Sequence, residues 1–170
     1  MIYTLGHSTR SIDEFADLLL ENGVQRVLDV RRFPGSRKFP HFTGDTFQQG
    51  LEERGIGYTH LPELGGRRSA GGADEGGYWR NASFRGYAKY MQSPEFRQGM
   101  ERLLALCDQE TCALVCAEAV PWRCHRSLIA DWLVAAGHSV THIMGKGKRQ
   151  PHTRNPNSRL MPDGTLVYVA

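Results

Sequence analysis

Residues 1–30 constrain the fold more than any other stretch, because they predict a strand, a helix and a second strand in quick succession. Residues 2–5 (Ile-Tyr-Thr-Leu) are typical of a short strand. Ser11 and Glu14 match the pattern of a capping box, and apolar residues at helical spacing follow them. Residues 27–30 (Val-Leu-Asp-Val) predict a second strand, which we expect to pair beside the first. A strand, helix and strand this close together form a crossover between parallel strands.

Later segments repeat this alternation of strand and helix patterns. The expected helices cover residues 47–54, a stretch beginning after Ser93, and about 123–136; the expected strands cover residues 56–61, 113–116, 140–143 and 166–169. Residues 31–90 are less regular, and the glycine-rich part at about 65–80 is typical of a loop or lid. We therefore predict one domain over residues 1–170 with a three-layer, Rossmann-like α/β fold, in which helices flank a mainly parallel sheet.

The composition is that of an ordinary water-soluble globular protein, with 40% hydrophobic and 23% charged residues. No stretch is long and apolar enough to span a membrane, and the first residues lack the basic start and apolar run of a signal peptide. The four cysteines follow no regular framework, which favours free thiols in a reducing compartment over a disulfide scaffold. We therefore expect a cytoplasmic protein with no membrane partner.

Positive charge is concentrated near the C-terminus. Residues 145–159 contain five Lys or Arg and no acid, and removing these five charges from the net charge of +3 leaves the remainder at −2. This basic segment is either a phosphate-contacting arm or a solvated connector. Arg67, Arg68 and the aromatic residues around the glycine-rich part add candidates for stacking on bases. A nucleic-acid-binding module without catalysis is therefore an alternative function.

Residues 114–126 carry most of the chemistry in the chain. The segment begins as a buried strand and ends in the first turn of the expected helix, and open α/β sheets bind their ligands at such joints. Backbone N–H groups at the start of a helix attract anions and lower the pKa of thiols. The candidate residues of this segment are Cys116, Glu118, Arg123, Cys124, His125 and Arg126.

These residue types suggest separate roles. Either cysteine is a candidate nucleophile, Glu118 is a candidate general acid or base, and the arginines are placed to hold an external anion. Successive side chains on a helix diverge by about 100°, so Cys124, His125 and Arg126 cannot all face one ligand, and one of them is expected to be structural. The competing interpretation is that the cysteines are core residues and the arginines pair with surface carboxylates.

Two other assignments of this segment fit less well. A phosphatase or rhodanese loop needs an arginine about five or six positions after its cysteine, whereas Arg123 follows Cys116 by seven and Glu118 would repel the anion. A zinc site would accept Cys, Glu and His ligands, but no Cys-x-x-Cys or His-x-x-x-His pair is present, so no metal ligand is predicted. A thiol-redox or metal-binding protein stays open as a further alternative.

Two more strand ends are expected to open on the same edge of the sheet. Gly6, His7 and Ser8 follow the first strand, and Arg31 follows the second. The carboxyl ends of parallel strands lie at one edge, so we expect these side chains to face the same hollow as Cys116. This convergence is the main sequence argument for a functional site.

Several of these motifs together resemble the DUF488 family. They occupy residues 4–8, 27–31, 58–65, 116–118, 124–126 and 156–160. The resemblance implies a compact α/β domain and no settled activity. The family's recurring residues fall on Gly6, His7, Ser8, Asp29, Arg31, Cys116, Glu118, Cys124, His125 and Arg126.

The leading hypothesis from the sequence is an enzyme that acts on a small anionic substrate, such as a nucleotide or another phosphorylated molecule. Its candidate catalytic residues are His7, Cys116, Glu118 and Cys124. Its candidate substrate-binding residues are Gly6, Ser8, Asp29, Arg31, Arg123, His125 and Arg126. No pattern in the chain identifies a cofactor, the reaction class or the oligomeric state.

Overall fold

The structure is a computed structural model that describes residues 1–35, 37–66 and 78–170. Within these residues, six strands form one sheet in the order β3-β2-β4-β1-β5-β6, and only the β5–β6 pair is antiparallel. A separate antiparallel pair, β7-β8, lies near the C-terminus. The strands are β1 (Ile2–Gly6), β2 (Arg26–Asp29), β3 (Gly57–His60), β4 (Cys112–Cys116), β5 (Val140–Gly145), β6 (Lys148–Pro151), β7 (Ser158–Leu160) and β8 (Leu166–Tyr168).

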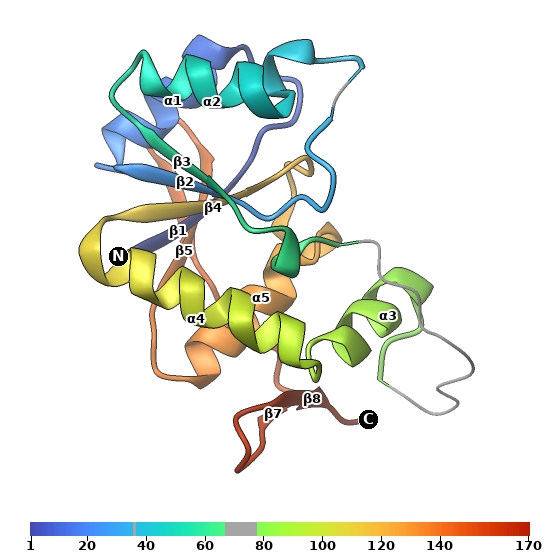
Figure 1. Cartoon of the computed structure of the whole chain (residues 1–170). Helices are drawn as coiled ribbons and strands as arrows, with labels where there is room; N and C mark the ends of the chain where they lie inside the picture. The colour runs from blue at the N-terminus through green and yellow to red at the C-terminus, as the bar shows by residue number, and fades with distance from the viewer. Residues whose placement is uncertain (36, 67–77) are drawn as a thin grey trace.

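Helices cover both faces of the sheet, which confirms the predicted α/β class (Figure 1). The layer formed by α1 and α2 packs on one face through a core that includes Phe15, Phe47 and Val115. The layer formed by α4 and α5 packs on the other face through a core that includes Leu103, Leu114 and Leu128. The helices of the described residues are α1 (Ile12–Glu21), α2 (Gly44–Glu52), α3 (Ala82–Tyr90), α4 (Pro94–Gln109) and α5 (Arg126–Ala135).

Strand β4 occupies the centre of the sheet, between β1 and β2. The expectation that β2 pairs beside β1 is therefore wrong. All five residues of β4 are buried, with Ala113 and Val115 facing one helical layer and Leu114 and Cys116 facing the other. A strand that is apolar on both faces belongs inside a parallel sheet, and this explains why β4 is inserted between the two earlier strands.

The order of the strands creates a crevice at the carboxyl ends of β1 and β4. The chain leaves β1 for α1 on one face of the sheet, whereas it leaves β4 for α5 on the opposite face. Two adjacent parallel strands with diverging connections mark a topological switch point, where α/β sheets bind ligands. The loops after Gly6 and Cys116 border this crevice.

Helix α5 begins later than the sequence predicts. It starts at Arg126 rather than near residue 123, because Pro121–Arg123 forms a separate 3₁₀ turn and Cys124 is extended (φ −130°, ψ 148°). His125 occupies the N-cap position. The expectation that Cys124, His125 and Arg126 share the first turn is therefore wrong, and Cys124 lies before the helix.

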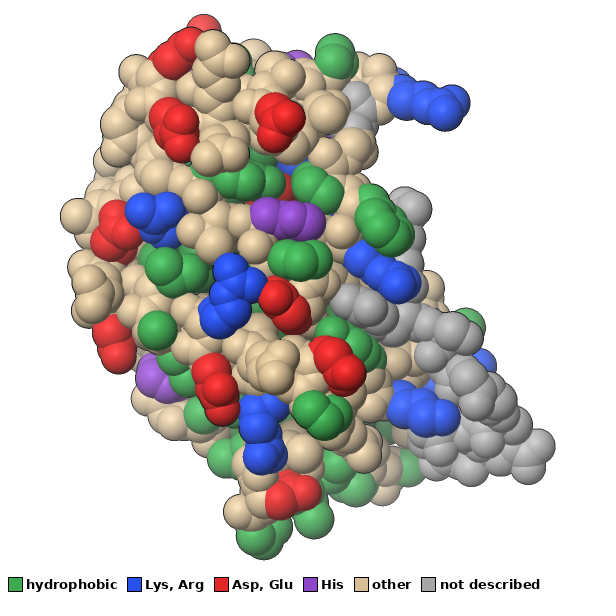
Figure 2. All heavy atoms as spheres, in the orientation of Figure 1, with side chains coloured by type: hydrophobic (Ala, Val, Ile, Leu, Met, Phe, Trp, Pro, Cys, Tyr) green, Lys and Arg blue, Asp and Glu red, His purple; other side chains and the backbone are tan. Residues whose placement is uncertain are grey.

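Part of the basic segment over residues 145–159 forms regular secondary structure. Residues Lys148–Pro151 form β6, which pairs with β5 at the edge of the sheet, and β7 begins at Ser158. The four residues of β6 are exposed, so its charges face solvent. On the face drawn in Figure 2, the described acidic and basic side chains are interspersed and form no continuous patch of one sign.

Part of the glycine-rich stretch predicted at residues 65–80 lies outside the described residues. Residues 67–77 are in this group, and they include Arg67 and Arg68 of the nucleic-acid hypothesis. In the part of the chain that is described, no helix combines the length and the apolar character that crossing a bilayer requires.

Candidate functional site

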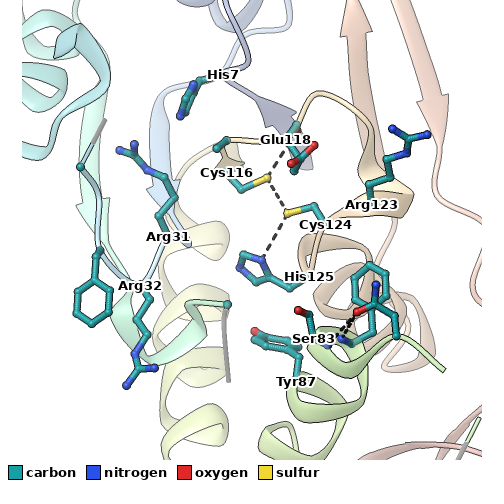
Figure 3. Close-up of a pocket in the computed structure, with 16 residues that line it drawn as sticks. His7, Arg31, Arg32, Ser83, Tyr87, Cys116, Glu118, Arg123, Cys124 and His125 are labelled. Carbon is teal, nitrogen blue, oxygen red and sulfur yellow. Dashed lines mark hydrogen bonds between the residues drawn. The ribbon is translucent and has the colours of Figure 1, made fainter. Parts of the chain in front are cut away.

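A pocket of about 460 Å³ opens at the carboxyl edge of the sheet (Figure 3). The loops after β1, β2 and β4 and the turn before α5 form most of its wall, and α3 closes it on a further side. Seven of the eleven residues predicted for the site line it: His7, Arg31, Cys116, Glu118, Arg123, Cys124 and His125. Gly6, Ser8, Asp29 and Arg126 do not line the pocket but lie directly behind its wall.

Arg31 is held rigidly by Asp29, the last residue of β2. The guanidinium makes two hydrogen bonds to the carboxylate, from Nε (2.9 Å) and Nη2 (2.8 Å). Asp29 also accepts from the Tyr58 hydroxyl at 2.6 Å, and burial together with this carboxylate raises the pKa of Tyr58. Asp29 is fully buried, so it fixes Arg31 instead of contacting a ligand.

One nitrogen of Arg31 is notable because the part of the chain that the structure describes offers it no partner. Nη1 is buried and has no hydrogen-bond acceptor among the described residues, although the side chain lines the pocket and is only 8% exposed. Buried donors in folded proteins are rarely unsatisfied. A guanidinium that is fixed on one edge and unsatisfied on the other is suited to bind an anion from the pocket.

The residues after β1 shape the wall of the pocket by close backbone contact. A Cβ atom on Gly6 would lie 1.7 Å from the carbonyl oxygen of Glu118, so only glycine allows this approach. The backbone N–H of His7 donates to the Cys116 carbonyl (2.8 Å), and that of Ser8 donates to the Ala117 carbonyl (3.0 Å). These contacts extend the β1–β4 pairing into the two loops.

His7 is a neutral side chain within this wall. It stacks on Phe42 with 4.2 Å between ring centroids, and its Nδ1 bonds to the Ser8 carbonyl at 3.0 Å. Burial, together with the nearby charge of Arg31, lowers the pKa of His7 to about 4. At neutral pH the ring therefore presents an uncharged nitrogen to the pocket rather than an additional cation.

The two cysteines of the predicted motif meet at the bottom of the pocket. Their sulfurs are 2.8 Å apart, and Figure 3 shows the two side chains pointing toward each other. Burial raises the pKa of the Cys116 thiol well above its ordinary value. Burial acts in the same direction on Cys124, but the hydrogen bond with Cys116 and the charge of Arg126 outweigh it, so its pKa is lowered. Cys124 is therefore the more acidic thiol.

Arg126 is a buried cation beneath the two sulfurs. Its side chain is 0% exposed, and Nη1 lies 3.2 Å from the Cys116 sulfur and donates to the Glu118 carbonyl at 2.8 Å. Nη2 donates to the Ala119 carbonyl at 3.0 Å. The sequence places Arg126 among the anion-binding residues, whereas in the structure its side chain is buried and does not line the pocket. Of Cys124, His125 and Arg126, Arg126 is the structural residue.

The His125 ring lies between the Cys124 sulfur and a backbone carbonyl and contacts both. The distance from the Cys124 sulfur to His125 Nδ1 is 3.4 Å, and His125 Nε2 bonds to the Val30 carbonyl at 2.7 Å. Because a carbonyl only accepts, Nε2 carries a proton, and Nδ1 of the neutral ring can accept one from the thiol. A thiol, a base and a group that orients the base are the elements of an activated nucleophile.

Glu118 and Arg123 stand at the solvent side of the pocket. Both side chains are exposed. In Figure 3, Arg123 and Arg31 lie on opposite sides of the two cysteines. The charges on the described part of the wall are thus three arginines, Arg31, Arg32 and Arg123, against one carboxylate, which gives the pocket a positive balance.

Helix α3 adds a wall that the sequence analysis does not predict. Asn81, Ser83, Phe84 and Tyr87 line the pocket from this helix and its N-terminus. Asn81 caps the helix by accepting from the N–H groups of Ser83 (2.8 Å) and Phe84 (3.3 Å). The signals for α3 in the sequence are this capping residue and the apolar spacing of Phe84, Tyr87 and Met91.

Among the described residues, no group of three or more His, Cys, Asp or Glu side chains is arranged to hold a metal ion. None of residues 145–159 lines the pocket, so the basic segment and the pocket are separate features. The pocket itself combines fixed cations with a pair of thiols, which suits thiol chemistry on an anionic molecule.

A family model described as a domain of unknown function, DUF488, matches residues 11–133 of the 170-residue chain. The chain belongs to the DUF488 family. The match covers Asp29, Arg31 and the whole segment from Cys116 to Arg126, and it begins after the loop that contains His7. Neither the curated proteins nor the solved structures include a match to the chain.

Proposed function

We propose that this DUF488 protein is an enzyme that binds a small anionic substrate in the pocket and uses Cys124 as its nucleophile. The observation that carries the proposal is Arg31, which lines the same pocket as an acidified thiol and whose Nη1 has no hydrogen-bond partner among the described residues. Phosphate esters, including nucleotides, fit best, because a planar guanidinium binds their oxygens through fixed hydrogen bonds. Arg123, on the opposite side of the cysteines, supplies a second positive charge.

The chemical step follows from the contacts of Cys124. Its sulfur attacks an electrophilic atom of the bound substrate and forms one new bond, and His125 Nδ1 receives the thiol proton. The leaving group departs with the electron pair of its bond to the substrate and takes the proton from His125. Glu118 and the neutral His7 are the remaining side chains of the wall that can transfer protons.

Phosphate binding tests the anion site. We expect inorganic phosphate and a nucleoside monophosphate to bind the purified protein, measured by titration calorimetry, with phosphate on Arg31 in soaked crystals. Arg31→Lys keeps one charge beside Asp29 but removes the planar fork, and we expect it to weaken phosphate binding about tenfold or more, which corresponds to roughly 1.4 kcal/mol.

Arg26→Lys is the matched control, because Arg26 is the first residue of β2, the strand that Arg31 follows, and is also paired with a carboxylate, that of Glu110 (2.7 Å). We expect this variant to bind phosphate as the wild type does. Saturating phosphate should also slow the alkylation of Cys124 by iodoacetamide. Equal phosphate affinity of Arg31→Lys and wild type, or phosphate bound only outside the pocket, would contradict the proposal.

A further inference from the structure

We propose that Cys116 and Cys124 form a reversible dithiol–disulfide couple that exchanges with low-molecular-weight disulfides. The inference goes beyond the substrate chemistry proposed above, because the bond forms between two side chains of the protein and Arg31 takes no part in it. It rests on the approach of the two sulfurs and on the charge that surrounds them.

The geometry places the two sulfurs almost within bonding distance. They are 2.8 Å apart, and a disulfide bond measures about 2.05 Å, so the sulfurs must approach by less than about 1 Å. Cys116 is fixed at the end of the central strand β4, while Cys124 belongs to the turn that precedes α5. The turn can therefore supply the small movement that closes the bond.

Arg126 indicates that the pair shares one negative charge. The guanidinium is 0% exposed, and no carboxylate among the described residues forms an ion pair with it. Buried charges are normally compensated by an opposite charge nearby. The Cys116 sulfur, 3.2 Å from Nη1, and its partner Cys124 are the groups in contact that can provide it as a thiolate. A thiolate hydrogen-bonded to a thiol is the reactive form of a redox pair.

The two cysteines differ in their contacts rather than in their exposure, which is 2% for Cys116 and 5% for Cys124. Both line the pocket, but Cys124 is also in contact with His125, which can remove its proton. Cys116 needs to reach only Cys124. This division makes Cys124 the attacking thiol and Cys116 the resolving thiol.

The reaction with oxidised glutathione balances in two steps. The Cys124 thiolate attacks one sulfur of glutathione disulfide, the glutathione S–S bond breaks, and one glutathione leaves and is protonated. Cys116 then loses its proton and attacks the Cys124 sulfur of the mixed disulfide, and the second glutathione leaves with a proton. The protein loses two electrons and the single thiol proton of the pair, solvent supplies the proton for the first glutathione, and one glutathione disulfide becomes two glutathione thiols.

Peptide mapping of the full-length protein tests the couple directly. After incubation with oxidised glutathione and blocking of free thiols, trypsin cuts at Arg102, Arg123 and Arg126, so Cys116 lies in peptide 103–123 and Cys124 in peptide 124–126. We expect the two peptides to be joined by a disulfide in the mass spectrum, and excess reduced glutathione to separate them again.

Three variants identify the bond and the order of the steps. Cys107→Ser/Cys112→Ser removes the other two cysteines, which lie in the same peptide as Cys116, and we expect it to form the linked peptides as the wild type does. Cys116→Ser should accumulate glutathione on Cys124, because the serine hydroxyl can still donate to that sulfur. In Cys124→Ser, Cys116 should react with oxidised glutathione at least about tenfold more slowly than Cys124 does in the wild type.

Recovery of Cys116 and Cys124 as free thiols in the wild type, or of glutathione on both without a link, would overturn the couple. Loss of the link in Cys107→Ser/Cys112→Ser would show that Cys124 pairs elsewhere and would overturn it as well. Arg31→Lys separates the two proposals, since we expect this variant to lose phosphate binding and still to form the disulfide.

Discussion

Gly6 shows how one residue determines the shape of the pocket. The carbonyl of Glu118 occupies the position that a side chain at residue 6 would need, and Arg126 Nη1 lies 2.8 Å from the same point. The close contact of these two loops therefore depends on the absence of a single methyl group. It also fixes the carbonyl that Arg126 uses as an acceptor.

Gly6→Ala should destabilise the protein and separate the two loops. The new methyl group would lie 1.7 Å from the Glu118 oxygen, which is backbone and cannot rotate away. Overpacking of this kind costs roughly 1–3 kcal/mol and occasionally more, and urea unfolding measures it. Gly35→Ala is the control, because a methyl group there meets no atom within 4 Å. Equal unfolding free energies for the two variants would contradict this account of the wall.

The sequence predicts where the candidate side chains lie better than it predicts which neighbour each of them contacts. The ends of β1, β2 and β4 could be recognised from the chain, and their polar side chains indicated one shared edge. That Asp29 and Arg126 support the wall from behind could not be predicted, because it depends on which partner each charge finds. Arg126 is directed inward by carbonyls of the loop before α5, and no sequence pattern records that contact.

At the scale of elements, α3 controls one side of the pocket. Its side chains Phe84 and Tyr87 face the pocket, and the Tyr87 hydroxyl donates to the Leu64 carbonyl at 2.7 Å. The helix has nine residues, which is short for a helix to form by itself. Its order therefore depends on its N-cap and on these tertiary contacts.

Asn81→Ala should weaken ligand binding by destabilising α3. Loss of an N-cap costs about 1 kcal/mol, so we expect faster amide exchange in α3 and weaker phosphate binding. Ser93→Ala removes an equivalent cap from α4, since the Ser93 hydroxyl accepts from the Phe96 N–H at 3.2 Å. Neither residue lines the pocket. That variant should lose similar stability and keep its phosphate affinity. A parallel loss of affinity in both variants would contradict a specific role for α3.

The elements that the sequence predicts are those with strong local signals. Helix α1 has both bonds of the capping box that Ser11 and Glu14 predict, and the apolar run of β4 forms a buried strand. The short strands β6 and β7 lack such signals, since β6 is polar and fully exposed. Its pairing with β5 follows from a tight turn and a free sheet edge, which are features of the assembled sheet.

At the scale of the whole molecule, a line of hydrogen bonds joins the N-terminal strand to the C-terminal residues. Thr4 Oγ1 bonds to His142 Nδ1 (2.5 Å), His142 Nε2 to His152 Nδ1 (2.8 Å), and His152 Nε2 to Asp131 (2.7 Å). Asp131 also accepts from the Tyr168 hydroxyl at 2.7 Å. The line crosses β1, β5, the segment after β6, α5 and β8.

Acid should loosen this connection and destabilise the fold. Burial and the neighbouring charge of His152 lower the pKa of His142 to about 3, from an ordinary value of 6.5. The unfolded chain therefore binds a proton at His142 more readily than the folded protein does. The stabilisation that neutral His142 provides is complete above pH 6.5 and is lost as the pH falls toward 3. His7, with a pKa of about 4, acts in the same direction. We expect the unfolding free energy to fall by about 1 kcal/mol per pH unit for each histidine.

Urea unfolding between pH 7 and pH 4.5 measures this dependence. His142→Asn should lower the stability at pH 7 and make its decline with acid shallower than in the wild type. His138→Asn changes an exposed histidine outside the line and should leave the decline unaltered. A wild-type stability that is constant from pH 6.5 to 4.5 would contradict the buried, neutral state of His142.

The place of β4 between β1 and β2 has a consequence for the newly made chain. Ile2 pairs with Cys112, so the two halves of the sheet stay unjoined until more than a hundred residues have been synthesised. Arg31 and His7 emerge from the ribosome early, yet they have no common wall until this late strand arrives. A chain that ends before β4 therefore lacks the assembled pocket and also lacks both of the cysteines that line it, Cys116 and Cys124.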